Sequence, residues 1–325
     1  MYDVLEGVNT SIRETHPAFE IYRNQRRLRD AGWSLQQISN ASNIDDPSHK
    51  AAWELDKFKF LHTLNKVHGE WPDKDWYVFV EADTYMNWPN LFAWLEQLDH
   101  TTELYIGSPS FMGGIKFNHG GSGYVLSGPA LRRFAAEHPG MATEWDERTS
   151  KECCGDYVLT LALKELGIPV SGVWPMLSGE CPLGTPFGPA LWCQPVITMH
   201  HVTPNDVQEM WSFEEAFTKE NRPMLFEDLY NHWLPGGLPE SRLDWDNRCP
   251  GSVFDIGAPE HSAESLDALY KCFTLGKAAA ASDGKVWHSV WRLNRINSWI
   301  EAHASCTNAA WTPVSTDNAR FGGVV

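Results

Sequence analysis

The sequence lacks any long apolar run. No stretch of about 18 consecutive apolar residues occurs, so no membrane-spanning helix is expected. The start of the chain, MYDVLEGVNT, has neither the basic segment nor the apolar segment of a secretory signal. We therefore expect neither a signal peptide nor an anchor in this chain.

Positive charge is scarce. Lys and Arg number 26 against 42 Asp and Glu, which gives a formal net charge of −16. Phosphates would be repelled by such a surface, because nucleic-acid binding depends on Lys and Arg neutralising the backbone. A nucleic-acid partner is therefore not expected. A local site for an anionic nucleotide remains possible if a metal ion lies between protein and phosphate.

Cysteine is present but not in metal-binding pairs. None of the seven Cys forms a CxxC pair with a matching partner, which argues against a structural zinc site. The spacing fits a few disulfides plus one leftover thiol, and it fits a reduced chain equally well. Cysteine usage alone therefore leaves the cellular compartment open.

Tryptophan is abundant, with 16 residues in the chain. Most of these side chains are expected in the core, and one or two could stack on an acceptor sugar. Hydrophobic residues make up 42% of the 325 residues, enough for one large core or two smaller ones.

Alternation of strands and helices from about residue 53 to 205 predicts an α/β fold. Residues 1–50 look mainly helical, with a loop at about 39–48. The segments expected beyond them are helix 51–67, strand 76–80, helix 88–98, strand 104–106, a Gly-rich turn and strand within 117–127, helix 156–166 and strand 196–201. After 215 the pattern weakens, and residues 287–304 read as a final amphipathic helix or hairpin.

Paired acids follow the strand at 76–80. Ligands of open α/β sheets bind beyond the carboxyl ends of strands. Glu81 and Asp83 are separated by one residue, so they project to the same side of an extended chain. Oxygen ligands of this kind can share Mn²⁺ or Mg²⁺, which would bridge the diphosphate of a nucleotide sugar.

Two adjacent histidines end the strand at 196–201. The imidazole of His200 could complete the metal shell, with His201 beside it. An equally good interpretation is a half-buried pair that only caps the strand.

Three further features have ordinary structural explanations as well. Gly120 and Gly121 could form a donor or acceptor wall, although an ordinary turn is favoured. Asp156, at a helix N-terminus, is either a cap or a general base for an acceptor hydroxyl. Lys57 could reach a phosphate, and the alternative is an exposed charged helix face.

Four blocks in this order resemble glycosyltransferase family 31, which contains the core 1 β1,3-galactosyltransferases and the Fringe proteins, and most closely its fungal members. They are WYVFVEADTYM at 76–86, HGGSGYVLSGPAL at 119–131, GDYVLTLALKELGI at 155–168 and ITMHHV at 197–202. Each block alone would be a weak signal, whereas the ordered set is specific.

The resemblance implies a GT-A-like mixed sheet flanked by helices, Mn²⁺ (or Mg²⁺), a UDP-sugar donor and inversion at the anomeric carbon. Glu81 and Asp83 fall on the metal motif, and His200 falls on the metal-ligand histidine. Asp156 falls on the acid that the family uses as catalytic base. Lys57, Glu81, Asp83, Gly120 and Gly121 are the residues expected around the donor. The family also implies a β1,3-type hexosyl transfer to a glycan or glycoprotein, in the Golgi lumen, by a membrane-anchored protein.

This sequence departs from the family pattern in places. Glu81 stands where the first Asp is usual, and Gly155 stands where the first acid of the Glu-Asp block is usual. Few residues before 76 read as strand, with Phe19–Tyr22 the best candidate. We therefore expect a GT-A-like domain at 1–215 without its N-terminal strands, and an extension of unknown role at 216–325.

Two hypotheses from different classes follow. The first is a metal-dependent inverting glycosyltransferase. The second is a catalytically inactive sugar-binding or scaffold module on the same fold, which the many Trp residues and the missing strands would explain.

Overall fold

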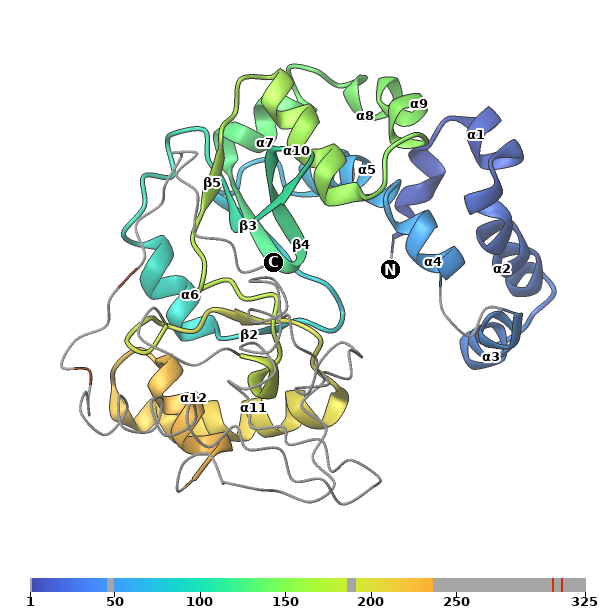
Figure 1. Ribbon diagram of the computed structural model, residues 1–325. Coiled ribbons are helices and arrows are strands. Elements are labelled where there is room, and N and C mark those ends of the chain that lie inside the picture. Colours follow the sequence, from blue (N-terminus) through green and yellow to red (C-terminus); the bar gives the residue numbers. More distant parts are fainter. Residues whose placement is uncertain (1, 46–49, 186–190, 236–305, 307–310, 312–325) are drawn as a thin grey trace, which may run out of the picture. The chain divides into compact units, whose positions relative to one another are not determined.

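The computed structural model describes residues 2–45, 50–185, 191–235, 306 and 311 (Figure 1). The chain forms two compact units, each described here by itself. Unit 1 comprises Met1–Phe79, Asp99–Gly120 and Tyr124–Gly172, and unit 2 comprises Val80–Leu98, Gly121–Gly123 and Val173–Val325. The two units are interleaved in sequence, because the chain passes between them several times.

Unit 1 is built on a mixed four-stranded sheet with the order β1-β4-β3-β5. The strands are β1 (Trp76–Phe79), β3 (Tyr105–Met112), β4 (Ile115–Ser127) and β5 (Val170–Gly172). Antiparallel ladders join β4 to both β1 and β3, whereas β3 and β5 are parallel. The expected mixed α/β, GT-A-like architecture is confirmed, and so is the strand that precedes the paired acids.

The helices of unit 1 are mostly short. They are η1 (Val4–Gly7), α1 (Thr10–Thr15), η2 (Pro17–Phe19), α2 (Glu20–Asp30), α3 (Leu35–Asp45), α4 (Lys50–Asp56), α5 (Lys59–Glu70), α7 (Gly128–Ala135), α8 (Met141–Glu144), α9 (Asp146–Thr149) and α10 (Gly155–Glu165). The helix predicted at 156–166 is confirmed as α10.

Three predictions for the first 70 residues are wrong. The strand candidate Phe19–Tyr22 lies in η2 and α2, because Pro17 suits the first position of a helix and straight-chain residues follow it. The loop expected at 39–48 is helical as far as Asp45. The helix expected at 51–67 is divided at residues 57 and 58 into α4 and α5.

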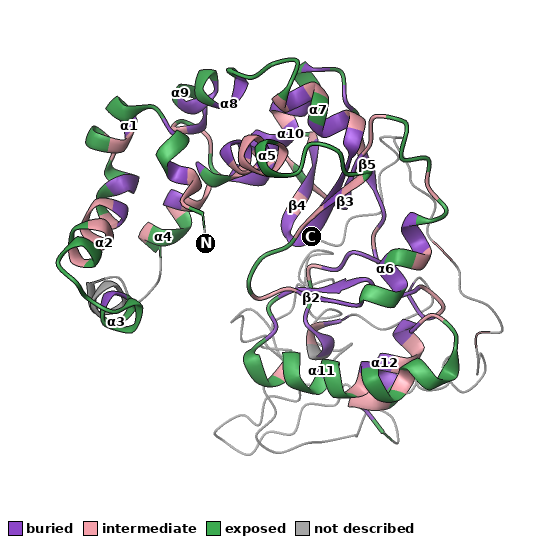
Figure 2. Cartoon of the chain, turned by 180° about the vertical axis from the view of Figure 1, so that it is seen from behind, coloured by how far each residue is buried: buried purple, intermediate pink, exposed green. Residues whose placement is uncertain are grey.

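The main core of unit 1 lies between the sheet and three helices. Leu64 of α5, Phe134 of α7 and Leu159 of α10 are fully buried and pack with Tyr105 and Leu126 of the sheet. Strands β3 and β4 are largely buried, whereas much of α1 and α2 is exposed (Figure 2). Burial of these large side chains, at about 25 cal/mol per Å² of apolar surface, holds the helices on the sheet.

A second, smaller core lies beneath the N-terminal helices. Phe19 and Phe58 are its centre, and their rings meet edge to face with centroids 4.9 Å apart. A buried polar contact connects this region to α5 and α9, since Asp146 Oδ1 lies 2.8 Å from His62 Nε2. The other oxygen of Asp146 accepts the backbone N–H of Asn9 at 2.7 Å.

Unit 2 contains a two-stranded antiparallel sheet and a helical layer. Its elements are β2 (Tyr85–Met86), α6 (Trp88–Leu95), η3 (Pro182–Gly184), β6 (Thr198–Met199), α11 (Pro204–Phe217), η4 (Thr218–Glu220) and α12 (Phe226–Trp233). The predicted helix at 88–98 is confirmed as α6. Of the strand predicted at 196–201, only Thr198 and Met199 form a ladder.

The core of unit 2 continues past the boundary predicted at 215. Met199 and Met210 pack in one cluster with Phe226 and Leu229 of α12. A disulfide joins Cys193 to Cys306, so residues on both sides of 215 belong to one covalently closed unit. The helix or hairpin predicted at 287–304 lies outside the described residues.

Asn90 of α6 joins three segments of unit 2. Its side-chain amide donates to the carbonyls of Val196 and Met224, both at 2.7 Å, and its oxygen accepts the N–H of Met224 at 3.1 Å.

In the part of the chain that the structure describes, no helix is long and apolar enough to cross a membrane.

Candidate functional site

The predicted metal residues of unit 2 meet at the ends of β2 and β6. In their antiparallel ladder Tyr85 lies opposite Met199. Residues just before β2 therefore lie beside residues just after β6, which brings Asp83 next to His200 and His201. A backbone hydrogen bond of 3.0 Å from Val202 N to the Asp83 carbonyl extends this pairing.

The side chains converge on one point. His200 Nε2 lies 3.5 Å from Asp83 Oδ1 and 3.7 Å from Glu81 Oε2. The other carboxylate oxygen of Asp83 lies 3.6 Å from His201 Nδ1. One ligand atom each from Asp83, His200 and His201 lie within 4.8 Å of one another. Two acids and two histidines, pairs that lie more than 110 positions apart in the sequence, thus form one cluster.

The donor set of this cluster fits a divalent cation. It offers carboxylate oxygens and imidazole nitrogens, a mixture that suits Mn²⁺. His200 is 5% exposed, whereas Asp83 keeps an open side, with 48% of its side chain exposed. Burial, and after it the neighbouring His200, lowers the pKa of His201. A lowered pKa favours the neutral imidazole, which is the form that binds a metal.

His201 has an unusual backbone conformation. Its φ is +56°, in the left-handed region that costs a non-glycine residue about 1–2 kcal/mol. The rings of His200 and His201 are stacked obliquely, with centroids 3.8 Å apart. The left-handed turn aims both imidazoles at the same carboxylate, which the sequence pattern HH could not indicate.

The glycine-rich block forms a bulge inside one continuous strand, not the turn before a strand that was predicted. The ladder between β3 and β4 goes from Ser108↔His119 directly to Gly107↔Tyr124. Residues 120–123 therefore have no partner in β3, and Gly123 has a φ of +80°. Within unit 2, Thr84 Oγ1 donates to the Gly121 carbonyl at 2.8 Å, and Thr198 Oγ1 donates to the Ser122 carbonyl at 2.6 Å.

Gly121 is required by close packing. A Cβ atom at this position would lie 2.2 Å from Cε1 of His200, a separation that real Cβ atoms do not show. Gly120, in unit 1, is likewise confined, since its Cβ would lie 2.9 Å from the Phe60 ring. Both glycines thus serve close approach of backbone to side chains, and contact with a donor stays a prediction.

Asp156 lies in the first turn of α10, in unit 1, and is 8% exposed. One carboxylate oxygen accepts the backbone N–H of Gly120 and the other that of Tyr157, each at 2.8 Å. Cys154 occupies the cap position that was considered for Asp156. Its carboxylate is therefore fixed in direction, and its role as a base stays a prediction.

The side chain of Lys57 is held by backbone carbonyls of unit 1. Its ammonium donates to the carbonyls of Ser150 and Glu152, at 3.1 and 2.8 Å. These bonds explain the lysine without any ligand. Burial lowers the pKa of Lys57, against the opposing effect of Glu54. Phosphate binding by Lys57 stays a prediction.

One buried pair was not foreseen from the sequence. Tyr85, two residues after Asp83, donates its hydroxyl hydrogen to Glu214 Oε2 of α11 at 2.5 Å. Burial raises the pKa of Glu214, although the Tyr85 hydrogen bond opposes that rise. The contact spans 129 positions, and no local pattern links the two residues.

Comparison with known proteins shows a matching family and a similar curated protein. Residues 29–234 match the family model described as Fringe-like, which covers more than half of the chain. A human chondroitin sulfate glucuronyltransferase is 29% identical over 132 residues. That alignment covers 39% of this chain and only 16% of the relative, so the chain spans a small part of that protein.

Proposed function

The chain belongs to the Fringe-like family, and on that premise we propose that it is a divalent-metal-dependent glycosyltransferase. It moves a hexose from a UDP-sugar to a hydroxyl group of a glycan or glycoprotein acceptor, with inversion at the anomeric carbon and formation of a β1,3 linkage. The observation that carries the proposal is the convergence of Asp83, His200 and His201 at the ends of β2 and β6.

The metal site is assigned to the cluster in unit 2. Asp83 and Glu81 would supply carboxylate oxygens, His200 would supply an imidazole nitrogen, and His201 would be an additional ligand. Mn²⁺ held by these residues would supply positive charge that offsets the diphosphate and favours the departure of UDP. Burial of His200 against Gly121 fixes the imidazole direction, so the ligand geometry is set before the donor arrives.

The transfer step needs a base. In it, the acceptor oxygen forms a bond to the anomeric carbon while the bond from that carbon to the UDP oxygen breaks, and the electron pair leaves with the diphosphate. We assign the acceptor proton to Asp156. Both of its oxygens accept backbone N–H groups, which hold the carboxylate in a fixed direction.

A Golgi lumenal location accompanies the proposed function. The Cys193–Cys306 disulfide supports it, because disulfides persist in the oxidising secretory compartments. The acceptor would be a glycan or glycoprotein passing through the same compartment.

A transfer assay with labelled UDP-sugars tests the proposal. Asp83→Ala removes a ligand oxygen and should abolish Mn²⁺-dependent transfer. The control is Glu96→Ala, which changes an exposed acid of unit 2 that lies outside the cluster. Full transfer by Asp83→Ala would refute the metal assignment. Metal-independent sugar binding without turnover would instead favour the sugar-binding module.

A further inference from the structure

A cavity of about 420 Å³ lies among the N-terminal helices of unit 1, and none of the residues assigned above lines it. Four arginines line it: Arg13 of α1 and Arg23, Arg26 and Arg27 of α2. Ligand pockets in proteins range from about 300 to 1,000 Å³, so the cavity is large enough for a small organic ligand.

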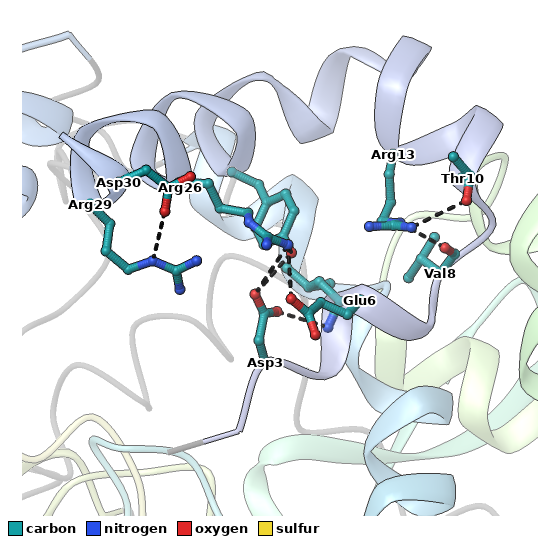
Figure 3. A network of polar contacts seen from close by, with 10 residues as sticks. Asp3, Glu6, Val8, Thr10, Arg13, Arg26, Arg29 and Asp30 are labelled. Atoms are coloured by element: carbon teal, nitrogen blue, oxygen red, sulfur yellow. Dashed lines mark hydrogen bonds and ion pairs between the residues drawn. The ribbon is translucent and has the colours of Figure 1, made fainter.

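The cavity is locally cationic in an acidic chain. Two acids, Glu14 and Asp30, line it beside the four arginines, so the lining has a formal charge of +2. The chain as a whole carries −16. Asp30 also lies 3.7 Å from Arg29, which does not line the cavity (Figure 3).

Only one of the four arginines is neutralised within the described residues. Arg26 pairs with Glu6 at 3.0 Å and approaches Asp3 at 3.9 Å (Figure 3). The hydrogen bonds of Arg13, Arg23 and Arg27 all go to neutral oxygen atoms. Three guanidinium charges therefore border the cavity without a carboxylate partner in the part of the chain that is described.

Two of these charges are held in position. Arg13 donates to the Val8 carbonyl at 2.9 Å and to Thr10 Oγ1 at 3.2 Å, as Figure 3 shows. Arg23 donates through Nη1 to the carbonyl of Arg13 at 2.7 Å. Neutral acceptors orient a guanidinium without cancelling its charge. A guanidinium has five N–H donors, so those not used in these bonds can donate to a ligand. The side chains are thus oriented before a ligand binds, which reduces the entropy cost of binding.

We propose that this cavity binds a small ligand bearing a phosphate or sulfate ester. A guanidinium fork matches two oxygens of a tetrahedral oxyanion, and clustered arginines are the usual recognition device for such groups. A bare ion would leave much of the 420 Å³ unfilled, so an organic portion is expected beside the buried ring of Tyr22. The site goes beyond the proposed transfer function and does not depend on it.

Calorimetric titration with glucose 6-phosphate, glucose 6-sulfate and uncharged glucose tests the site. At least one ester should bind the wild-type protein, in the presence of EDTA, and glucose should not. Binding should weaken as ionic strength rises, because the charges border open solvent. Tighter binding of one ester shows whether the natural ligand carries a phosphate or a sulfate group. Either result supports the proposal that the cavity binds an oxyanion ester.

Matched variants on α2 locate the ligand. Arg27→Gln should weaken ester binding about tenfold, the effect of one lost charge-assisted hydrogen bond. Arg27→Lys should fall between, since it keeps the charge and loses the fork. Arg29→Gln removes an equal charge from the same helix outside the cavity and should leave binding unchanged.

Unchanged circular-dichroism melting in these variants shows that each is folded. Lack of ester binding by the folded wild type overturns the proposal. So does an Arg29→Gln variant that loses as much affinity as Arg27→Gln. Because EDTA is present throughout, failure here is distinguishable from failure of the metal cluster in unit 2.

Discussion

A methyl group added at Gly121 should disable the metal cluster through His200. The new Cβ would lie 2.2 Å from Cε1, 2.5 Å from Nε2 and 2.7 Å from Nδ1 of the imidazole. Neither side can yield easily, because His200 is buried and the Gly121 carbonyl is held by Thr84. The ring must therefore turn away from Asp83 or the bulge must shift.

The magnitude follows from the packing. Over-packing a buried site costs about 1–3 kcal/mol. For a chain of this size the melting temperature falls by roughly 2–4 °C for each kcal/mol. The displaced imidazole should also weaken Mn²⁺ binding by about tenfold or more, the effect of one lost or misdirected ligand contact.

A double-mutant cycle isolates the cause. Unfolding free energies are measured by urea denaturation for wild type, Gly121→Ala, His200→Ala and the double variant, and Mn²⁺ affinity is measured by electron paramagnetic resonance. His200→Ala removes the clashing ring, so Gly121→Ala should cost little in that background. Gly69→Ala, at a position with nothing within 4 Å of the new methyl, serves as the control. An equal cost of Gly121→Ala in both backgrounds would refute the clash.

Three further predictions concern unit 2. Burial raises the pKa of Glu214 above its usual 4.5, so the unfolding free energy of the wild type should decline as the pH rises from 4.5 to the raised pKa. Glu214→Gln cannot ionise. In urea denaturation, its unfolding free energy relative to that of the wild type should therefore be higher at pH 7 than at pH 4. The unfolding free energy of His201→Gly should be about 1 kcal/mol higher than that of His201→Ala, because only alanine keeps the cost of the left-handed backbone. Both variants should lose Mn²⁺ affinity equally. Equal unfolding free energies would count against backbone strain at this position. Asn90→Leu should lower the unfolding free energy by about 2–4 kcal/mol, because three hydrogen bonds to backbone groups are lost in a buried site, and a change below 1 kcal/mol would contradict this role.

Local pattern was sufficient where one segment determines its own structure. The aromatic and β-branched run at 76–80 and the helix at 156–166 were predicted close to their observed bounds. Acids directly after a buried strand, and a His pair after another, predicted residues that the structure brings together in the candidate metal cluster. These residues could be predicted because ligands of α/β sheets bind beyond the carboxyl ends of strands, where polar residues that directly follow a buried strand lie.

Features that depend on distant partners were not readable. The carbonyls that accept the Lys57 ammonium belong to residues 93 and 95 positions further along the chain. In the bulge at 120–123, the His200 ring occupies the space where a Cβ atom of Gly121 would lie, and His200 is about 80 positions away in the sequence. The left-handed turn at His201 and the Tyr85–Glu214 contact likewise arise from tertiary packing, for which a single sequence offers no periodic signal.

Thermal unfolding with UDP, with and without Mn²⁺, in wild type and Asp83→Ala, tests the metal-dependent donor site most directly. A ligand at 100 times its dissociation constant stabilises the folded state by about 2.7 kcal/mol. At roughly 2–4 °C per kcal/mol, UDP with Mn²⁺ should raise the wild-type melting temperature by about 5–10 °C. We predict that this shift requires Mn²⁺ and disappears in Asp83→Ala. A shift of the same size without the metal or in Asp83→Ala, or no shift in the folded wild type, would contradict the proposed site.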